Sequence, residues 1–80
     1  MPKVRRKRLP RTLFRHLLER VHEREITTGQ LEELLEWLDL EPKVPNGKWF
    51  KKFQEMTVCG EGEWILTFLR ADQAPAGEEL

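Results

Sequence analysis

Apolar residues in the first third of the chain recur with the period of an α-helix. Between residues 10 and 24 they lie one, three or four residues apart, as expected for one face of an amphipathic helix. The members of this stripe are Leu13, Phe14, Leu17, Leu18 and Val21. Pro10 suits the first turn of a helix, where a backbone N–H has no intrahelical partner. The pattern predicts a helix over about residues 10–24.

A second helical stripe follows, and its start is clearly marked. Thr27, with Gln30 three residues later, matches the capping box, in which the threonine side chain accepts a backbone hydrogen bond. Four leucines continue the stripe: Leu31, Leu34, Leu35 and Leu38. Pro42 disfavours helical geometry at the residue before it. The pattern predicts a second helix from Thr27 to Asp39 or Leu40, antiparallel to the first.

A short third helix is predicted over about residues 47–55. Trp49, Phe50 and Phe53 lie at helical spacing, and three lysines would occupy the opposite face. These lysines are Lys48, Lys51 and Lys52. A strand starting near Phe50 also fits this segment, because aromatic side chains are common in strands.

A β-hairpin is predicted after this helix. Residues 56–59 and 64–70 have the composition of two short strands, and Gly60 and Gly62 between them suit a hairpin turn. Along the second strand apolar residues fall on both faces. Because a small monomer has little with which to cover both faces, this pattern favours a homodimer.

Together these elements predict a small single α+β domain with two antiparallel helices, a short third helix and a C-terminal β-hairpin. This order resembles a winged helix-turn-helix protein in outline. Residues 10–70 would form the domain, residues 1–9 a basic N-terminal arm and residues 71–80 a flexible acidic tail. The predicted core consists of Leu13, Phe14, Leu17, Leu18, Val21, Ile26, Leu31, Leu34, Leu35, Leu38, Trp49, Phe53, Val58, Leu66 and Phe68.

Composition narrows the class of protein. A length of 80 residues leaves room for one domain, and 39% hydrophobic with 35% charged residues is typical of a globular chain with a charged surface. No apolar run is long enough to span a membrane, and no apolar stretch of a secretory signal follows the basic start. The single cysteine, Cys59, excludes an internal disulfide. We therefore expect a cytoplasmic protein with no membrane partner.

No set of residues forms a known catalytic or metal-binding motif. His16 and His22 are six residues apart on a predicted helix, so they do not share a face. Cys59 has no basic neighbour, and Glu61 and Glu63 would raise its pKa. The chain contains no serine, which removes the serine nucleophile. The sequence therefore predicts a protein that is not an enzyme and has no cofactor or metal.

The net charge of zero conceals a strong segregation of charge. Residues 1–24 carry a net charge of +7, residues 25–41 carry −6, residues 42–54 carry +4 and residues 55–80 carry −5. Such blocks can attract partners of opposite charge. The adjoining basic and acidic blocks can also neutralise each other within the molecule.

The basic blocks suggest a binding module acting at nucleic acid or at a nucleic-acid-handling complex. The side chains expected to contact phosphates, or an acidic protein surface, are Arg5, Arg6, Lys7, Arg8, Arg11, Arg15, Lys48, Lys51 and Lys52. In the winged-helix interpretation the helix carrying the lysines would enter the major groove and the hairpin turn would be the wing.

Three features oppose sequence-specific reading of DNA. The connection at residues 41–47 contains two prolines and is longer than the usual tight turn. Glu61 and Glu63 would place negative charge on the wing. The third helix offers lysines rather than the Arg, Asn or Gln that read base edges. The sequence therefore favours backbone contact over base recognition.

The alternative is an inhibitor or adaptor that binds a partner protein complex. Its contact face would be the acidic second helix, with Glu32, Glu33, Glu36 and Trp37. Small size, no catalytic set and a charge-segregated surface are typical of phage- or plasmid-encoded inhibitors such as antitoxins and anti-CRISPR proteins. No motif in the chain distinguishes this alternative from the first hypothesis.

Overall fold

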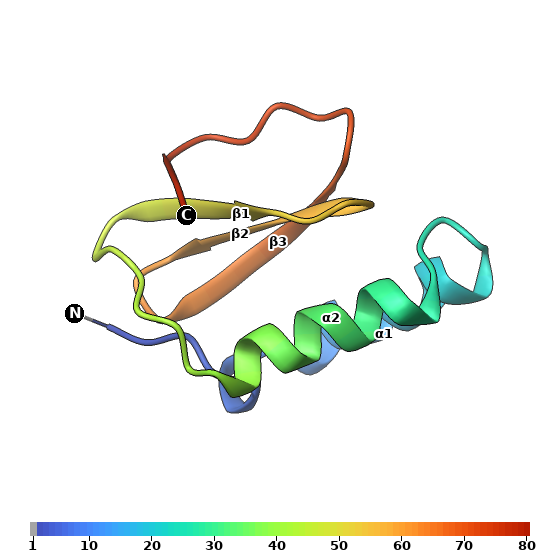
Figure 1. Cartoon of the computed structure of the whole chain (residues 1–80), viewed down its shortest axis with the longest axis horizontal. Helices are drawn as coiled ribbons and strands as arrows, with labels where there is room; N and C mark the ends of the chain where they lie inside the picture. Colours follow the sequence, from blue (N-terminus) through green and yellow to red (C-terminus); the bar gives the residue numbers. More distant parts are fainter. Residues whose placement is uncertain (1) are drawn as a thin grey trace.

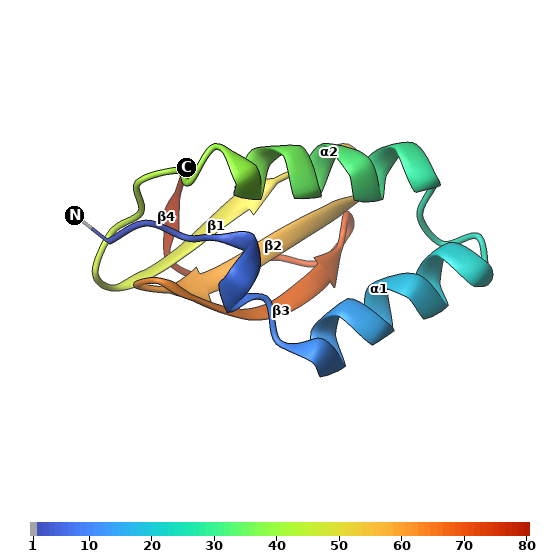
Figure 2. The ribbon, with the colours of Figure 1, turned by 90° about the horizontal axis from the view of Figure 1, so that it is seen from below.

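The computed structural model describes residues 2–80 as two helices and a four-stranded sheet. A single 3₁₀ turn, η1 (Arg6–Arg8), precedes the helices α1 (Arg11–His22) and α2 (Thr28–Asp39). The strands are β1 (Lys48–Lys52), β2 (Met56–Glu61), β3 (Trp64–Arg70) and β4 (Glu78–Glu79). Both helices lie on one face of the sheet (Figures 1 and 2), so the molecule has two layers.

The sheet is mixed, with the strand order β3-β2-β1-β4. The pairs β1–β2 and β2–β3 are antiparallel, whereas β4 runs parallel to β1. The segment between β3 and β4, residues 71–77, crosses the face of the sheet away from the helices (Figure 1). This crossing places the C-terminus beside β1, at the edge of the sheet opposite β3.

The predicted third helix is wrong, and with it the predicted architecture. Residues 48–52 form strand β1 rather than part of a helix. Trp49 is fully buried in the core beneath the helices, while its neighbour Phe50 is buried outside that core cluster. Only the alternation of a strand sends adjacent residues to opposite faces. Without this helix the winged-helix order is lost, and β1 joins the two predicted strands in a larger sheet.

The two ends of the chain also pack against the domain. Val4 is fully buried, and its N–H donates to the carbonyl of Pro42 at 3.1 Å. At the other end the N–H of Leu80 donates to the carbonyl of Phe50 at 2.8 Å. The packed part of the chain therefore extends beyond residues 10–70, the bounds predicted for the domain.

The start of α2 confirms the predicted cap at Thr27 but not the full capping box, because Glu55 takes the place of Gln30 in the reciprocal bond. Thr27 precedes the helix in an extended conformation, and its Oγ1 accepts from the N–H of Gln30 at 3.1 Å. The carboxylate of Glu55 accepts from the N–H of Thr27 at 2.7 Å. The side chain of Gln30 accepts in turn from the N–H of Glu55 at 3.0 Å. These bonds fix the start of α2 to the turn between β1 and β2.

A β-bulge in β3 changes which residues are buried. Cys59 pairs with Thr67, but the next residue of β2, Gly60, pairs with Ile65, so Leu66 is an extra residue. Ile65 therefore joins Phe68 in the core, although it was not predicted there, and Leu66 is 51% exposed.

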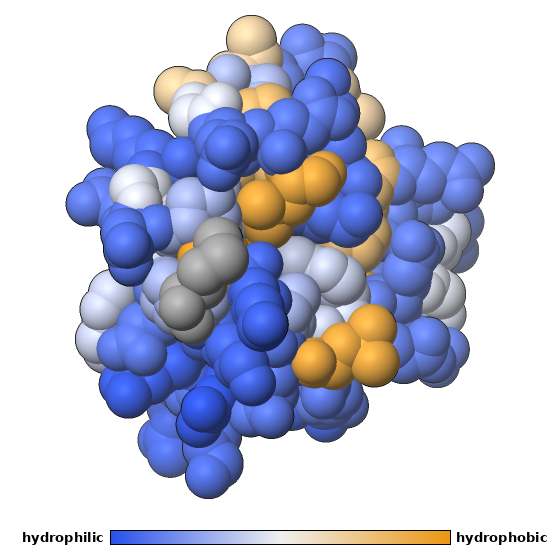
Figure 3. All heavy atoms as spheres, turned by 60° about the vertical axis from the view of Figure 1, so that its left-hand side comes forward, coloured by the Kyte–Doolittle hydropathy of each residue, from blue (hydrophilic) through white to orange (hydrophobic). Residues whose placement is uncertain are grey.

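On the side of the molecule drawn in Figure 3, the apolar residues that reach the surface lie in separate patches among hydrophilic ones.

Candidate binding groove

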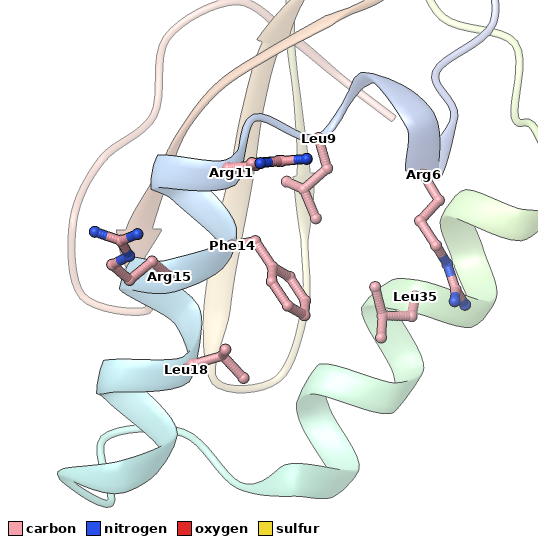
Figure 4. Close-up of a pocket in the computed structure, with 7 residues that line it drawn as sticks. All are labelled: Arg6, Leu9, Arg11, Phe14, Arg15, Leu18 and Leu35. Carbon is pink, nitrogen blue, oxygen red and sulfur yellow. The ribbon is translucent and has the colours of Figure 1, made fainter.

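A groove of about 430 Å³ opens between η1, α1 and α2. Its wall combines four apolar residues with three arginines (Figure 4): Leu9, Phe14, Leu18 and Leu35, and Arg6, Arg11 and Arg15. The helices lie close at the turn that joins them and diverge towards the start of α1 (Figure 2). The groove occupies the space between the diverging ends.

Two of the four apolar wall residues form a second row of side chains on α1. Leu13, Leu17 and Val21 face the core, as predicted. Phe14 and Leu18, one position further along, line the groove instead of packing against the core cluster, and Leu18 is 46% exposed. The ring of Phe14 points towards Leu35 on α2 (Figure 4). The prediction of Phe14 and Leu18 as core residues is therefore wrong.

The basic side of the groove is not neutralised by the protein itself. Arg11 and Arg15 form no ion pair within residues 2–80. Arg11 extends over the groove beside Leu9, whereas Arg15 points to the outer side of α1 (Figure 4). α1 also begins without a side-chain cap and without an acidic residue in its first turn. The positive end of the helix dipole therefore adds to the charge of these arginines.

Three arginines of the basic N-terminal segment are paired with acids of the same chain. Arg5 lies 2.9 Å from Glu41, and Arg6 lies 2.6 Å from Asp39. Arg8 lies 3.8 Å from Glu63, and its guanidinium stacks 4.8 Å from the ring centroid of Trp64. All of these charged side chains remain about half exposed, so each pair contributes roughly 0–1 kcal/mol to stability. Internal pairing, one of the two alternatives that the charge blocks left open, is thus confirmed for Arg5 and Arg6.

The three predicted lysines lie on β1, in a different part of the molecule from α1. Lys48 and Lys52 point to the face of the sheet away from the helices, because they alternate with Trp49. Lys51 lies on the helix side, where Nζ is 5.9 Å from the ring centroid of Phe53. The nine basic residues predicted to act together therefore do not form one surface.

The acidic face predicted for the alternative hypothesis is only partly available. Glu32, Glu33 and Glu36 are exposed on α2. Trp37 is half-buried, and its ring makes edge-to-face contacts with Trp49 at 6.1 Å and with Phe53 at 5.8 Å between centroids. This packing holds Trp37 in the core, so it is not a free anchor for a partner.

Sequence reasoning missed the groove, although the sequence carried a signal for it. The apolar stripe of α1 contains two pairs of adjacent apolar residues, at positions 13–14 and 17–18. It is therefore wider than a single row of side chains that packs against a core. Leu9 lies in the segment predicted as an arm. Its place in the groove wall depends on the position of η1, which the sequence did not predict. A wide apolar stripe flanked by arginines at helical spacing is the pattern that would have predicted this site.

The chain offers little for metal or thiol chemistry. Within the described residues, no group of three or more His, Cys, Asp or Glu side chains is placed to hold a metal ion. Cys59 is half-buried on β2, and burial raises the pKa of its thiol. No helix in the described part of the chain has the length and apolar composition needed to cross a bilayer.

We expect Cys59 to react slowly while the protein is folded. Because its pKa is raised, the thiolate that attacks iodoacetamide is scarcer near neutral pH than in the unfolded chain. The folded state also holds this proton more tightly, so the contribution to stability is full below the unfolded pKa and falls as pH rises through the folded value. Mass spectrometry of alkylation with and without urea checks the prediction, and equal rates in the two states would contradict it.

The structure is a small α+β domain with an apolar, arginine-rimmed groove. No family model matches the chain, and comparison with curated proteins and with solved structures gives no match either.

Proposed function

We propose that the protein is a non-enzymatic binding module of the cytoplasm that captures an acidic, partly apolar segment of a partner protein in its groove. The observation that carries this proposal is the position of Phe14 and Leu18 beside Arg11 and Arg15. Apolar side chains that remain accessible in a concave site mark contact surfaces. Unpaired arginines beside them favour carboxylates.

The same observations weigh against nucleic acid as the first partner. A phosphate backbone is bound by several cations on one surface. Here Arg5, Arg6 and Arg8 are paired with acids of the chain, and the lysines of β1 lie apart from α1. Three of the four apolar residues in the groove wall are leucines, and Phe14 is its one aromatic residue on which a base could stack. An acidic protein segment fits both the apolar and the basic parts of the site.

The test is fluorescence anisotropy with two kinds of probe. One is a labelled peptide of leucine, alanine and glutamate, and the other is labelled random-sequence DNA or RNA, each titrated from about 50 to 200 mM salt. We expect the peptide to bind and the double variant Arg11→Ala, Arg15→Ala to weaken it about tenfold, since two exposed ion pairs contribute up to about 1 kcal/mol each. The matched control is Lys48→Ala with Lys52→Ala, which removes the same charge far from the groove.

The outcomes separate the candidate functions. Binding of DNA or RNA that depends on Arg11 and Arg15, without binding of the peptide, would replace the protein partner by a nucleic acid. Loss of peptide binding in the lysine control as well would mean that the groove is not the site. If no probe binds at the lowest salt, the proposed function is wrong.

A homodimer remains a separate prediction. Trp64 and Leu66, about half exposed on the edge strand β3, are the apolar side chains that support it. They are exposed on a different element from the groove, so dimerisation through them and partner binding are compatible. Sedimentation equilibrium of the protein and of Leu66→Glu checks this prediction, and a monomer at all concentrations would contradict it.

A further inference from the structure

We infer that the acidic segment bound in the groove is an amphipathic α-helix, whose apolar row packs between α1 and α2. The inference rests on the proposed function, and it specifies the conformation of the partner. Three properties of the groove support it: the absence of a strand edge in its wall, the direction of its apolar row and the spacing of its arginines.

The first property concerns hydrogen bonds of the partner's backbone. The groove wall consists of side chains from η1, α1, α2 and the adjoining Leu9, and no strand of the sheet contributes to it. An extended peptide in such a groove would bury N–H and C=O groups that find no partner. A helix satisfies its own backbone groups and presents only side chains, which is the usual mode of binding in an apolar groove between helices.

The second property is the direction of the apolar row. Phe14 and Leu18 are four residues apart, so they lie one above the other along α1, separated by a rise of about 6 Å. Leu35 faces them from α2 (Figure 4). A row of this kind accepts the ridge of another helix, in which apolar residues recur every three or four positions. The partner would thus add a third helix to the helical layer.

The third property is the placement of positive charge along the same helix. Arg11 and Arg15 are also four residues apart on α1; Arg11 lies beside the apolar row, and Arg15 lies at the outer rim of the groove. Acidic residues of a partner helix repeat on one face at the same interval. On the opposite side of the groove Arg6 lies 2.6 Å from Asp39, and a partner carboxylate would compete for it. Acids flanking an apolar row on the partner would therefore meet arginines on both sides.

A second copy of the chain does not supply such a helix. α2 carries exposed glutamates, but its apolar side is occupied by the core, where Leu34 and Leu38 are fully buried. The acidic C-terminus is extended, with Glu78 and Glu79 paired to β1. Using either segment as the bound helix would unfold it from its own domain. The groove therefore fits a helix of a different protein.

The experiment uses a capped peptide of about 18 residues, long enough to show measurable helicity, with leucines at helical spacing flanked by glutamates. A second peptide has the same composition in an order without helical periodicity, and a third carries a central proline. Titration into the isotope-labelled full chain is followed by NMR, and peptide helicity by circular dichroism. We expect the patterned peptide to bind at least tenfold more tightly than the other two, to gain helicity and to shift the signals of Leu9, Phe14 and Leu18.

Two protein variants locate the binding site. Leu18→Glu should lower affinity at least tenfold, whereas Leu66→Glu should not, although the two leucines are exposed to similar extents. If Leu18→Glu fails to fold, Arg11→Glu, on an exposed side chain, tests the same groove. Asp39→Asn should raise affinity severalfold, because it frees Arg6 for the partner.

Each other outcome has a defined meaning. If the patterned peptide and the peptide without helical periodicity bind equally well at the groove, the inference of a helical partner is wrong, but the proposed function is not contradicted. Equal losses in Leu18→Glu and Leu66→Glu, both folded, would overturn the groove as the site. If none of the acidic peptides binds, both the inference and the proposed function are wrong, whether or not the protein binds the DNA or RNA probe.

Discussion

Replacing Trp49 by alanine should remove a large part or all of the protein's unfolding free energy at room temperature. Trp49 is fully buried, and its Nε1–H donates to the carbonyl of Gly62 at 2.8 Å. Removing a buried aromatic side chain of this size costs about 3–5 kcal/mol. A domain of this length has a total unfolding free energy of about 4–12 kcal/mol, so the loss takes a large part or all of it.

The expected loss is at the upper end of that range because Trp49 links the sheet to α2. Its ring meets Trp37, which also packs against Phe53. The hydrogen bond to Gly62 ties the same side chain to the turn between β2 and β3. An alanine would leave a cavity between both layers and an unpaired carbonyl beside it.

Urea denaturation followed by far-ultraviolet circular dichroism checks this prediction. Trp64→Ala is the matched control, because Trp64 is 50% exposed and therefore loses less buried surface than Trp49, together with its contact with Arg8, worth about 0.5–1 kcal/mol. Similar denaturation midpoints for the two variants would show that Trp49 does not hold the layers together. A folded Trp49→Phe variant with intermediate stability would separate the contribution of the ring from that of the hydrogen bond.

The helices could be predicted from the sequence because their signals are local. The period of the leucines and the cap at Thr27 act within a few residues, and both helices form where these signals place them, to within about two residues. The strand β1 could not be separated from a helix in this way, since Trp49, Phe50 and Phe53 satisfy both periods. Its state is decided by pairing with β2 and by burial of Phe50 on the second face of the sheet.

The candidate site depended even more on contacts between distant residues. The sequence predicted Arg11 and Arg15 as contact residues, and the structure brings them to one groove with Arg6. It could not show that Arg6 is paired with Asp39, 33 residues away, or that the lysines of β1 lie elsewhere. Charge blocks describe composition along the chain, whereas a binding surface depends on which side chains the fold brings together.

The role of Gly60 also depends on a contact with a residue distant in the sequence. Both glycines were predicted in the hairpin turn, but only Gly62 has positive φ, at 56°. Gly60 lies within β2, opposite Trp49 in the pairing of β1 and β2. A Cβ at Gly60 would lie 2.3 Å from Cζ2 of Trp49 and 2.6 Å from the carbonyl oxygen of Trp64. Gly60 is therefore required by close packing rather than by a turn.

Gly60→Ala should consequently destabilise the protein by about 1–3 kcal/mol or more, as overpacking does in well-packed interiors. Gly47→Ala is the matched control, because a Cβ there meets nothing within 4 Å; it should be neutral or stabilising by up to about 1 kcal/mol. Urea denaturation measures both. Equal stability of the two variants would contradict the close contact.

A double-mutant cycle identifies which neighbour resists the added methyl group. If the ring of Trp49 is the main obstacle, Trp49→Phe should reduce the cost of Gly60→Ala, and the two changes should be non-additive by at least about 0.5 kcal/mol. If the carbonyl of Trp64 is the obstacle, the cost should be unchanged in the Trp49→Phe background, because that backbone group belongs to β3. Either result locates the constraint, and the first would mean that this glycine and Trp49 specify the sheet as a pair.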